Sequence, residues 1–238
     1  VLGRDTLEKL LICKKHNNLN VLGPKILDYY GKDIHSGHKC TIDCTGYIGY
    51  GKKTFFIDGC ALMIGKRDFF DLGGFDEKYF MYSEDIDLCW RAHLYGMNVE
   101  ICRDAVIRHF AGGTGGRTQY KRHGDHTVPL LRRFEVEKNN LRNIMKNYRL
   151  KNLMWVVPLY VLQSMGECLV YLFSGNFEAM KVVLKAHMWN LSNIGDTLCK
   201  RKIIQKKRVV GDEHILTMMF FGLNKFLAFR SIGLPKFK

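Results

Sequence analysis

The chain has 238 residues, 47% of them apolar and 25% charged, which is enough to bury a core and excludes wholesale disorder. Lysine and arginine number 37 against 23 acids, and the resulting net charge of +14 favours polyanionic partners such as anionic lipid, nucleic acid or phosphate-bearing substrates. Eight scattered cysteines fit buried, reduced thiols better than a secreted disulfide framework. The chain opens without Met, in helix-like sequence that does not resemble a signal peptide, so we expect that an N-terminal portion is missing.

Hydrophobic periodicity predicts mixed helices and strands in the first half of the chain. The spacing of apolar residues predicts helices over 6–15 and 84–95 and a short helix or turn over 66–72. Strands are predicted over 21–27, 55–64 and 99–106, with a ribbon or loop over 28–52. Glycines at 73, 74 and 96 would end two of the helices.

The second half predicts a helical region that begins with a basic amphipathic helix over 130–149. Residues 153–173 are long and apolar enough to suggest a membrane span. Their polar side chains fall on one helical face, which favours a helix in the membrane interface or packed on a domain, and the spanning alternative stays open. These side chains are Tyr160, Gln163, Ser164, Glu167 and Tyr171.

Basic and apolar segments alternate in the rest of the second half, over 177–194, 200–208 and 215–229. Their succession favours attachment to an anionic membrane leaflet over a helical subdomain with a solvated basic face.

Four acids in the middle of the chain could carry chemistry: Asp76, Glu77, Glu84 and Asp85, with Asp87 just beyond. An acid at the start of the helix predicted over 84–95 would lie where unpaired amides favour the carboxylate form, and it could accept a proton from an attacking hydroxyl. Taken alone, Glu84, Asp85 and Asp87 are explained better as an N-cap with a solvated acidic first turn. Asp87 is expected to pair with Arg91, and Asp85-x-Asp87 matches the metal-binding pattern DxD only weakly, because side chains two apart on a helix diverge.

Histidines and cysteines raise the question of a metal site. His109 lies between a predicted strand and the glycine-rich loop AGGTGG, where it could ligate a metal, although a lone histidine is more often structural. His35, His38, Cys40 and Cys44 form a denser cluster that could hold zinc, but their spacing fits no common zinc pattern.

The ordered series of these motifs over roughly residues 5–150 resembles the family 2 inverting glycosyltransferases of the GT-A fold, in their rhamnosyl- and galactofuranosyltransferase-like branch. The series comprises Asp58-Gly59, Gly73-Gly74-Phe75-Asp76-Glu77, Phe80, Glu84-Asp85-x-Asp87-Leu88-x-x-Arg91, Gly96 and His109 with Gly112-Gly113-Thr114. Lys138-Asn139-Asn140 and the basic segment before Asp212 also resemble the C-terminal helical extension of that branch.

The resemblance implies roles for individual residues. Asp85 matches the catalytic base that deprotonates the acceptor hydroxyl, and Glu84 flanks it. His109 matches a histidine that completes a Mn or Mg site on the leaving diphosphate. Asp58 and Gly59 match the strand that borders the donor pocket, while Gly73, Gly74 and Phe75 match the acceptor-side turn. The loop residues Gly113 and Thr114 complete the implied substrate-binding set.

The resemblance therefore predicts an α/β fold: a partial GT-A (Rossmann-like) domain followed by an α-helical C-terminal extension. Residues 1–120 would form the acceptor-side half of the catalytic domain, and residues 121–238 a basic, membrane-associating helical extension. The nucleotide-binding half with which the family begins, and its metal-binding DxD, are not present before Thr6. We therefore expect this polypeptide to bind donor poorly by itself.

The sequence thus predicts an enzyme that moves a sugar from a nucleotide-diphosphate donor to a glycan or lipid-linked acceptor with inversion, on the cytoplasmic, inner face of the cell membrane. One alternative is a non-catalytic fragment that keeps only glycan or membrane binding. Another is a nucleic-acid-binding protein, but the chain has no RNP-like or helix-turn-helix pattern, so no nucleic-acid partner is predicted.

Overall fold

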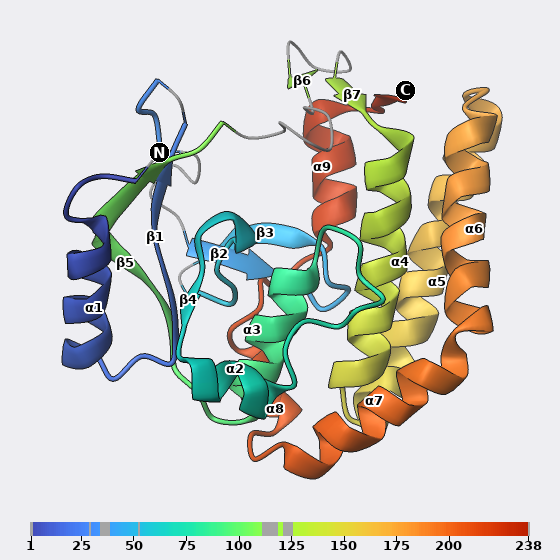
Figure 1. Ribbon diagram of the computed structural model, residues 1–238. Coiled ribbons are helices and arrows are strands. Elements are labelled where there is room, and N and C mark those ends of the chain that lie inside the picture. Colours follow the sequence, from blue (N-terminus) through green and yellow to red (C-terminus); the bar gives the residue numbers. More distant parts are fainter. Residues whose placement is uncertain are drawn as a thin grey trace.

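The computed structural model describes residues 2–28, 30–33, 39–51, 53–110, 119–120 and 126–237, which form a mixed α/β structure. Figure 1 shows a small sheet flanked by α1, a group of long helices α4, α5 and α6 on the opposite side, and α3 between them. The elements in chain order are α1 (Thr6–His16), β1 (Val21–Leu27), β2 (Lys39–Ile42), β3 (Ile48–Gly51), the 3-10 helix η1 (Gly59–Ala61), β4 (Met63–Ile64), α2 (Lys66–Leu72), α3 (Glu84–Leu94), β5 (Val99–Arg108), β6 (Gln119–Tyr120), β7 (His126–Val128), α4 (Leu130–Asn147), α5 (Leu150–Phe173), α6 (Phe177–Ser192), α7 (Ile194–Lys207), α8 (Asp212–Leu216), α9 (Asn224–Ile232) and β8 (Lys236–Phe237).

The principal sheet has the strand order β4-β1-β5, with β1 parallel to β5 and antiparallel to β4. Its register shifts between Pro24 and Lys25, where the proline cannot donate a ladder hydrogen bond. The neighbouring segment lies so close to Gly23 that a Cβ there would come within 2.2 Å of Ile57, so this position requires glycine. This close approach fixes the chain immediately before Asp58 and Gly59.

The predicted strand over 55–64 is wrong for most of its length, because only Met63 and Ile64 pair with β1. Residues Phe55, Phe56 and Ile57 are at most 2% exposed but are not in a named strand, and the Phe55 amide donates to the Cys40 carbonyl at 2.8 Å. A short run of apolar residues predicts that a segment is buried. It does not predict whether that segment pairs as a strand or is an extended part of the core.

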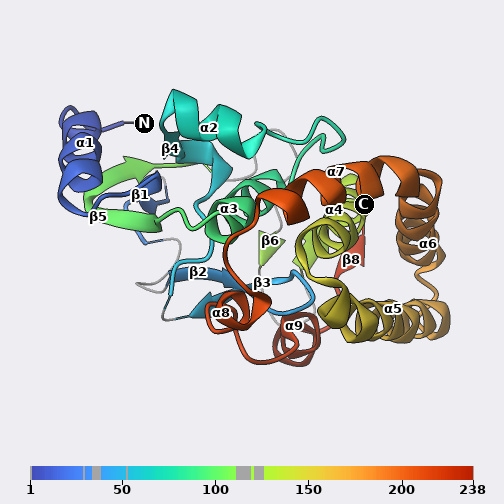
Figure 2. The ribbon, with the colours of Figure 1, turned by 90° about the horizontal axis from the view of Figure 1, so that it is seen from below.

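Helix α4 lies at the centre of the molecule, between α3 and the pair α5 and α6 (Figure 2). The sequence predicted a basic amphipathic helix here, but most polar side chains of α4 are buried and engaged in ion pairs and hydrogen bonds. Lys138, for example, is 4% exposed and pairs with Glu135 at 2.6 Å. The charges of this helix therefore bind other parts of the chain rather than solvent.

Helix α5 turns its polar stripe inward. Tyr160, Ser164 and Tyr171 are at most 3% exposed, and Glu167 pairs with Arg133 of α4 and Lys225 of α9. Within the described residues, α5 is the one helix long and apolar enough to cross a membrane, and 22% of its apolar window is buried inside the protein. Because the polar side faces the protein, the apolar side faces outward.

A single cluster of buried apolar residues extends across residue 120, from Val21 in β1 through Leu141 in α4 to Ile215 in α8. The two predicted segments therefore share a core. The functional division into a catalytic segment 1–120 and a membrane-associating segment 121–238 stays a prediction.

Candidate active site

The turn before α3 has an unusual backbone conformation. Tyr82 and Ser83 have φ angles of 65° and 63°, so two consecutive residues with side chains are left-handed. Such residues cost about 1–3 kcal/mol each and persist only where the surroundings hold them. Helix α3 begins directly after this turn, and its first two residues are Glu84 and Asp85.

Asp85 is half-buried at the start of α3, and its carboxylate accepts the backbone N–H of Gly59 at 2.8 Å and that of Ile86 at 2.7 Å. Burial, followed by the neighbouring Glu84 carboxylate, raises the pKa of Asp85 from 3.8 to about 7. The sequence predicted that the start of the helix lowers the pKa of this acid and keeps it ionised, and this prediction is wrong in direction. Burial and the neighbouring negative charge raise the pKa by more than the hydrogen bonds from the backbone amides lower it. A carboxylate with a pKa near neutrality suits general-base chemistry.

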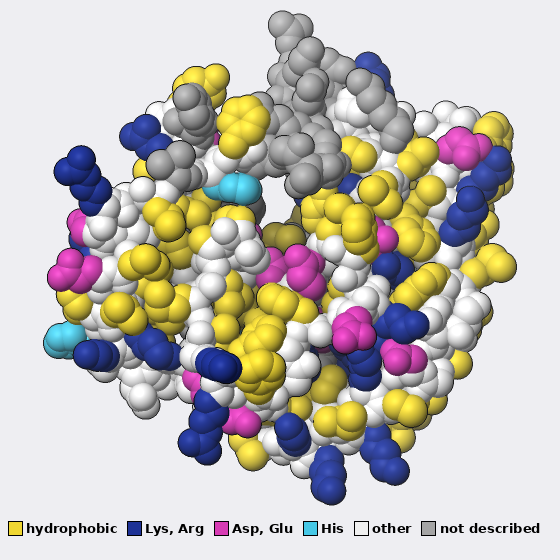
Figure 3. Space-filling view, viewed as in Figure 1, with side chains coloured by type: hydrophobic (Ala, Val, Ile, Leu, Met, Phe, Trp, Pro, Cys, Tyr) yellow, Lys and Arg dark blue, Asp and Glu magenta, His cyan; other side chains and the backbone are white. Residues whose placement is uncertain are grey.

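Glu84 and Asp58 lie close to the same carboxylate. A Cβ built on Gly59 would lie 3.4 Å from the Asp85 Oδ2 and 3.7 Å from the Glu84 Oε1. Burial also raises the pKa of Glu84, and the Asp58 carboxylate accepts the thiol of Cys40 at 3.7 Å. Figure 3 shows a hollow near the middle of this face with acidic side chains at its edge. The structure therefore brings together two pairs that the sequence predicted separately, Asp58-Gly59 and Glu84-Asp85.

Two other acids of the region, Asp76 and Asp87, have structural roles, whereas Glu77 is exposed. Asp87 is fully buried and pairs with Arg91 at 2.8 Å, as predicted, and with Lys146 at 2.9 Å. Asp76 is 6% exposed and pairs with Arg142, Lys146 and Lys200. Because Asp87 is held in these ion pairs, the pair Asp85-x-Asp87 does not form a metal-binding DxD.

The predicted acceptor-side turn is anchored from α3. Gly73 and Gly74 have φ angles of 87° and 68°, a conformation that glycine adopts at little cost. The Arg91 guanidinium donates to the carbonyl of Gly74 at 2.9 Å, and Phe75, 45% exposed, packs its ring against Phe69. The substrate-binding role of this turn stays a prediction.

His109 follows β5, half-buried, and its backbone N–H donates to the Leu27 carbonyl at 2.8 Å. In the part of the chain that the structure describes, no group of three or more His, Cys, Asp and Glu side chains could hold a metal ion. Gly113, Thr114, His35 and His38 lie outside the described residues. The metal site is therefore not assembled by the described side chains.

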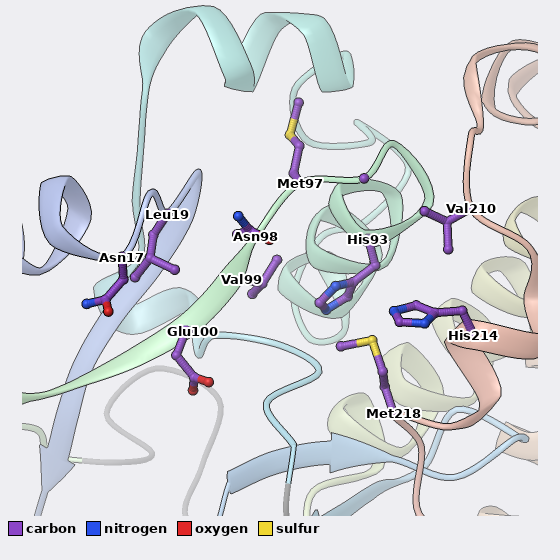
Figure 4. A pocket seen from close by; sticks show the side chains of 11 residues that line it. Asn17, Leu19, His93, Met97, Asn98, Val99, Glu100, Val210, His214 and Met218 are labelled. Carbon is purple, nitrogen blue, oxygen red and sulfur yellow. The ribbon is translucent and has the colours of Figure 1, made fainter.

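A cavity of about 590 Å³ opens beside the end of α3, the start of β5 and helix α8, and none of the predicted site residues lines it. Figure 4 shows His93 and His214 close together on one side of it, with Glu100 farther along β5. Burial lowers the pKa of His93 to about 4, while its Nε2 lies 2.8 Å from the Phe55 carbonyl oxygen. His93 is thus a neutral core histidine.

The sequence singled out Asn139 and Asn140 within the motif Lys138-Asn139-Asn140 but gave no role to the asparagines of α4 that contact the turn before α3. Asn139, Asn140 and Asn143 are each at most 1% exposed, and all three bond to residues 81–83. Their signal in the sequence is the residue type, since asparagine is unfavourable in a helix interior unless its side chain has a specific partner.

Comparison with known proteins connects this region to glycosyltransferases. Residues 40–111 match the model of a family described as the N-terminal domain of galactosyltransferase. A Mycobacterium tuberculosis N-acetylglucosaminyl-diphospho-decaprenol L-rhamnosyltransferase is 39% identical over 61 residues, 25% of this chain and 20% of the relative. Rhamnosyltransferase WbbL of Escherichia coli is 46% identical over 58 residues, 23% of this chain and 22% of the relative.

A more extended match is to the low-salt glycan biosynthesis hexosyltransferase Agl10 of Haloferax volcanii, 24% identical over 119 residues. That match spans 44% of this chain and 38% of the relative, so the chain spans well under half the length of the curated relatives it matches. The family-model match includes Asp58, Gly59, Glu84, Asp85 and His109. The segment that carries the acid pair is therefore similar to glycosyltransferases.

Proposed function

We propose that this chain carries the acceptor-side half of an inverting glycosyltransferase of the GT-A type, in the rhamnosyl- and galactofuranosyltransferase-like branch of family 2. The observation that carries the proposal is the Asp85 carboxylate, which has a pKa of about 7 and is fixed against Gly59 beside Glu84. Similarity of residues 40–111 to glycosyltransferases supports it. The enzyme would act in the synthesis of a cell-surface polysaccharide or glycolipid.

The proposed reaction needs a base on the acceptor side. Asp85 would accept the proton of an acceptor hydroxyl while that oxygen forms a bond to the anomeric carbon of the donor sugar. The bond from that carbon to the nucleotide diphosphate breaks on the opposite face, so the configuration inverts and the electron pair leaves with the diphosphate. Glu84 would help to orient the acceptor, and its nearby charge contributes to the raised pKa of Asp85.

The proposed metal cofactor is Mn or Mg, for which His109 would supply one ligand. When bound, such a cation would offset the charge that develops on the leaving diphosphate. The described side chains do not assemble the remainder of its site, so no step above depends on it.

A direct test offers the chain nucleotide-diphosphate sugars together with glycan and lipid-linked acceptors. The donors are supplied at high concentration, because we expect this polypeptide by itself to bind them weakly. Transfer with inverted anomeric configuration, followed by NMR of the product, is the expected result. A retained configuration would contradict the proposed mechanism. Acceptor binding without turnover would instead favour a non-catalytic fragment that keeps glycan or membrane affinity.

The proposal places the protein peripherally on the inner, cytoplasmic face of the cell membrane. Helix α5 presents a row of exposed apolar side chains, whereas its polar stripe faces α4 and α9. The row consists of Leu150, Met154, Leu162, Met165, Leu169 and Phe173. Exposed Lys151, Lys181 and Lys185 on α5 and α6 would complement anionic headgroups, each contributing on the order of 1 kcal/mol.

The basic run over 200–208 contributes less to this surface than the sequence suggested. Lys200 pairs with Asp76, and Arg208 pairs with Asp212. Arg201 and Lys207 donate to backbone carbonyls within the protein. The apolar face of α5 is therefore the stronger part of the proposed membrane contact.

Replacing Leu162 and Leu169 together with Ser is expected to reduce binding to anionic phospholipid vesicles at least tenfold, because two exposed apolar side chains would no longer enter the bilayer. Vesicle co-sedimentation measures the change. The matched control replaces Leu7 and Leu11 of α1, which are similarly exposed, and should bind like the parent chain. Equal binding by both double variants would contradict this orientation.

A further inference from the structure

The asparagines of α4 form a clamp on the backbone that leads into the acid pair. The side-chain amide of Asn139 donates to the carbonyl of Met81 at 3.0 Å and to that of Tyr82 at 2.7 Å. Asn143 donates to the carbonyl of Ser83 at 3.2 Å. One helix thus holds three successive carbonyls of the turn, which Figure 1 shows lying beside α4.

These contacts coincide with the strained part of the turn. Tyr82 and Ser83 are the two left-handed residues, and such a conformation would relax if nothing held it. The Ser83 hydroxyl also donates to the Asn140 side-chain oxygen at 2.9 Å, and the Asn143 side-chain oxygen accepts the Tyr79 hydroxyl at 2.7 Å. Hydrogen bonds from the loop therefore also orient the side chains of Asn140 and Asn143.

The side-chain oxygen of Asn139 is buried and has no hydrogen-bond partner among the described residues. A buried polar atom without a partner is unfavourable, so the two hydrogen bonds that the amide group of Asn139 donates must offset this cost. The side-chain oxygen of Asn190 is likewise without a partner in the described part of the chain, which makes Asn190 a matched control. Both hydrogen bonds that Asn139 makes go to the strained turn.

We propose that Asn139 and Asn143 are positioning residues for the acid pair: they hold the turn 81–83 in its left-handed conformation, and this places Asp85 against Gly59. The inference rests on the proposed role of Asp85 as the base. It adds residues of α4, from the predicted extension, to the machinery of the predicted catalytic segment.

The experiment measures the side-chain carboxyl of Asp85 directly, in the full 238-residue chain, by NMR with carbon-13-labelled aspartate. The resonance is assigned by its disappearance in Asp85→Asn. In Asn139→Ala the turn should relax and admit water, so the midpoint of the Asp85 titration should fall by at least one pH unit and the Gly59 amide should exchange faster with solvent. Asn143→Ala should shift the titration in the same direction by less, because it removes one bond to the turn rather than two.

A second substitution separates positioning from mere stability. In Asn139→Ala combined with Ser83→Gly, glycine adopts the left-handed conformation at low cost, so the Asp85 titration should return toward that of the parent chain. The matched control is Asn190→Ala, which removes a buried asparagine of α6 that donates to the Lys138 carbonyl but does not contact the turn. The control should leave Asp85 unchanged.

An unchanged Asp85 titration in both Asn139→Ala and Asn143→Ala would overturn the proposal, as would equal shifts in Asn190→Ala. Should Asn139→Ala fail to fold, Asn143→Ala alone decides between these outcomes. The measurement needs no substrate, so it is independent of the sugar-transfer assay. A chain that transfers no sugar but shows the expected titrations would refute the proposed function and leave the clamp intact.

Discussion

Replacing Asp85 with Asn is expected to lower sugar transfer by about 10²–10⁴-fold, the usual contribution of a general base. The same substitution should stabilise the chain above pH 7. The pKa of Asp85 is about 7 in the folded protein against an ordinary value of 3.8, so the folded state binds more protons between these values. Stability is therefore lost as the pH rises through this window, and asparagine avoids that loss.

The size of the stabilisation follows from the same values. The full difference corresponds to at most about 4 kcal/mol, and the half-buried carboxylate keeps some solvent, so we expect about 1–3 kcal/mol at pH 8. Urea unfolding at pH 8 and pH 4 measures this, and the difference between variant and parent should vanish at pH 4. Glu77→Gln, an exposed change in the same region, is the control for the unfolding measurement and should not alter stability. Retained transfer by Asp85→Asn would remove Asp85 as the base.

Replacing Asp76 with Asn is expected to cost about 3–5 kcal/mol of unfolding free energy, because it removes a buried carboxylate that three cations share. The two buried cations, Arg142 and Lys146, would each keep one carboxylate partner, Asp196 and Asp87 respectively. Asp76 lies 2.7 Å from Lys146 of α4 and 2.6 Å from Lys200 of α7, and it also accepts the Arg142 guanidinium. These cations hold the pKa of Asp76 below its ordinary value despite its burial. One carboxylate in the loop between α2 and α3 thus joins that loop to α4 and α7.

The pH dependence of this effect provides an internal check. Because the folded pKa of Asp76 lies below 3.8, its stabilisation is present above that pH and is lost as the pH falls further. Denaturant unfolding at pH 7 should therefore show the full cost of Asp76→Asn, and the cost should shrink below pH 4. Glu77→Gln again provides the control, with an expected change within about 0.5 kcal/mol. A cost below 1 kcal/mol at pH 7 would show that the ion pairs of Asp76 contribute little to the free energy of unfolding.

Much of the local structure followed from the sequence. The strand Val21–Leu27 and the helix Lys66–Leu72 have the predicted bounds, and the helix predicted over 84–95 is observed as Glu84–Leu94. These elements depend on periodicity and on glycine terminators, both of which are local signals. The pairing of Asp87 with Arg91 was likewise predictable, since residues four apart on a helix are neighbours.

The strand predicted over 55–64 is wrong for most of its length, whereas the helix predicted over 130–149 is observed but the burial of its polar side chains was not predicted. Both differences have one reason. The side chains of both segments are buried by partners distant in sequence: Ile57 by the close approach to Gly23, and Lys146 by its ion pairs with Asp76 and Asp87. From the sequence alone, a basic residue in a helix is expected to face solvent. Its burial can be predicted only when the acidic residues that pair with it are known.

By itself, the sequence determined the order and type of most elements and the position of the polar residues of α5 on one helical face. Through the family resemblance it also singled out Asp85 and Glu84 as the acids with possible chemistry. Only the tertiary structure decided that the polar stripe of α5 faces inward, that Asp76 is structural and that Asp87 also pairs with Lys146. It also decided that burial raises rather than lowers the pKa of Asp85 and that α4 holds the turn before α3. The physical reason is that pKa values and backbone strain depend on atoms brought close by folding, which residue spacing along the chain does not specify.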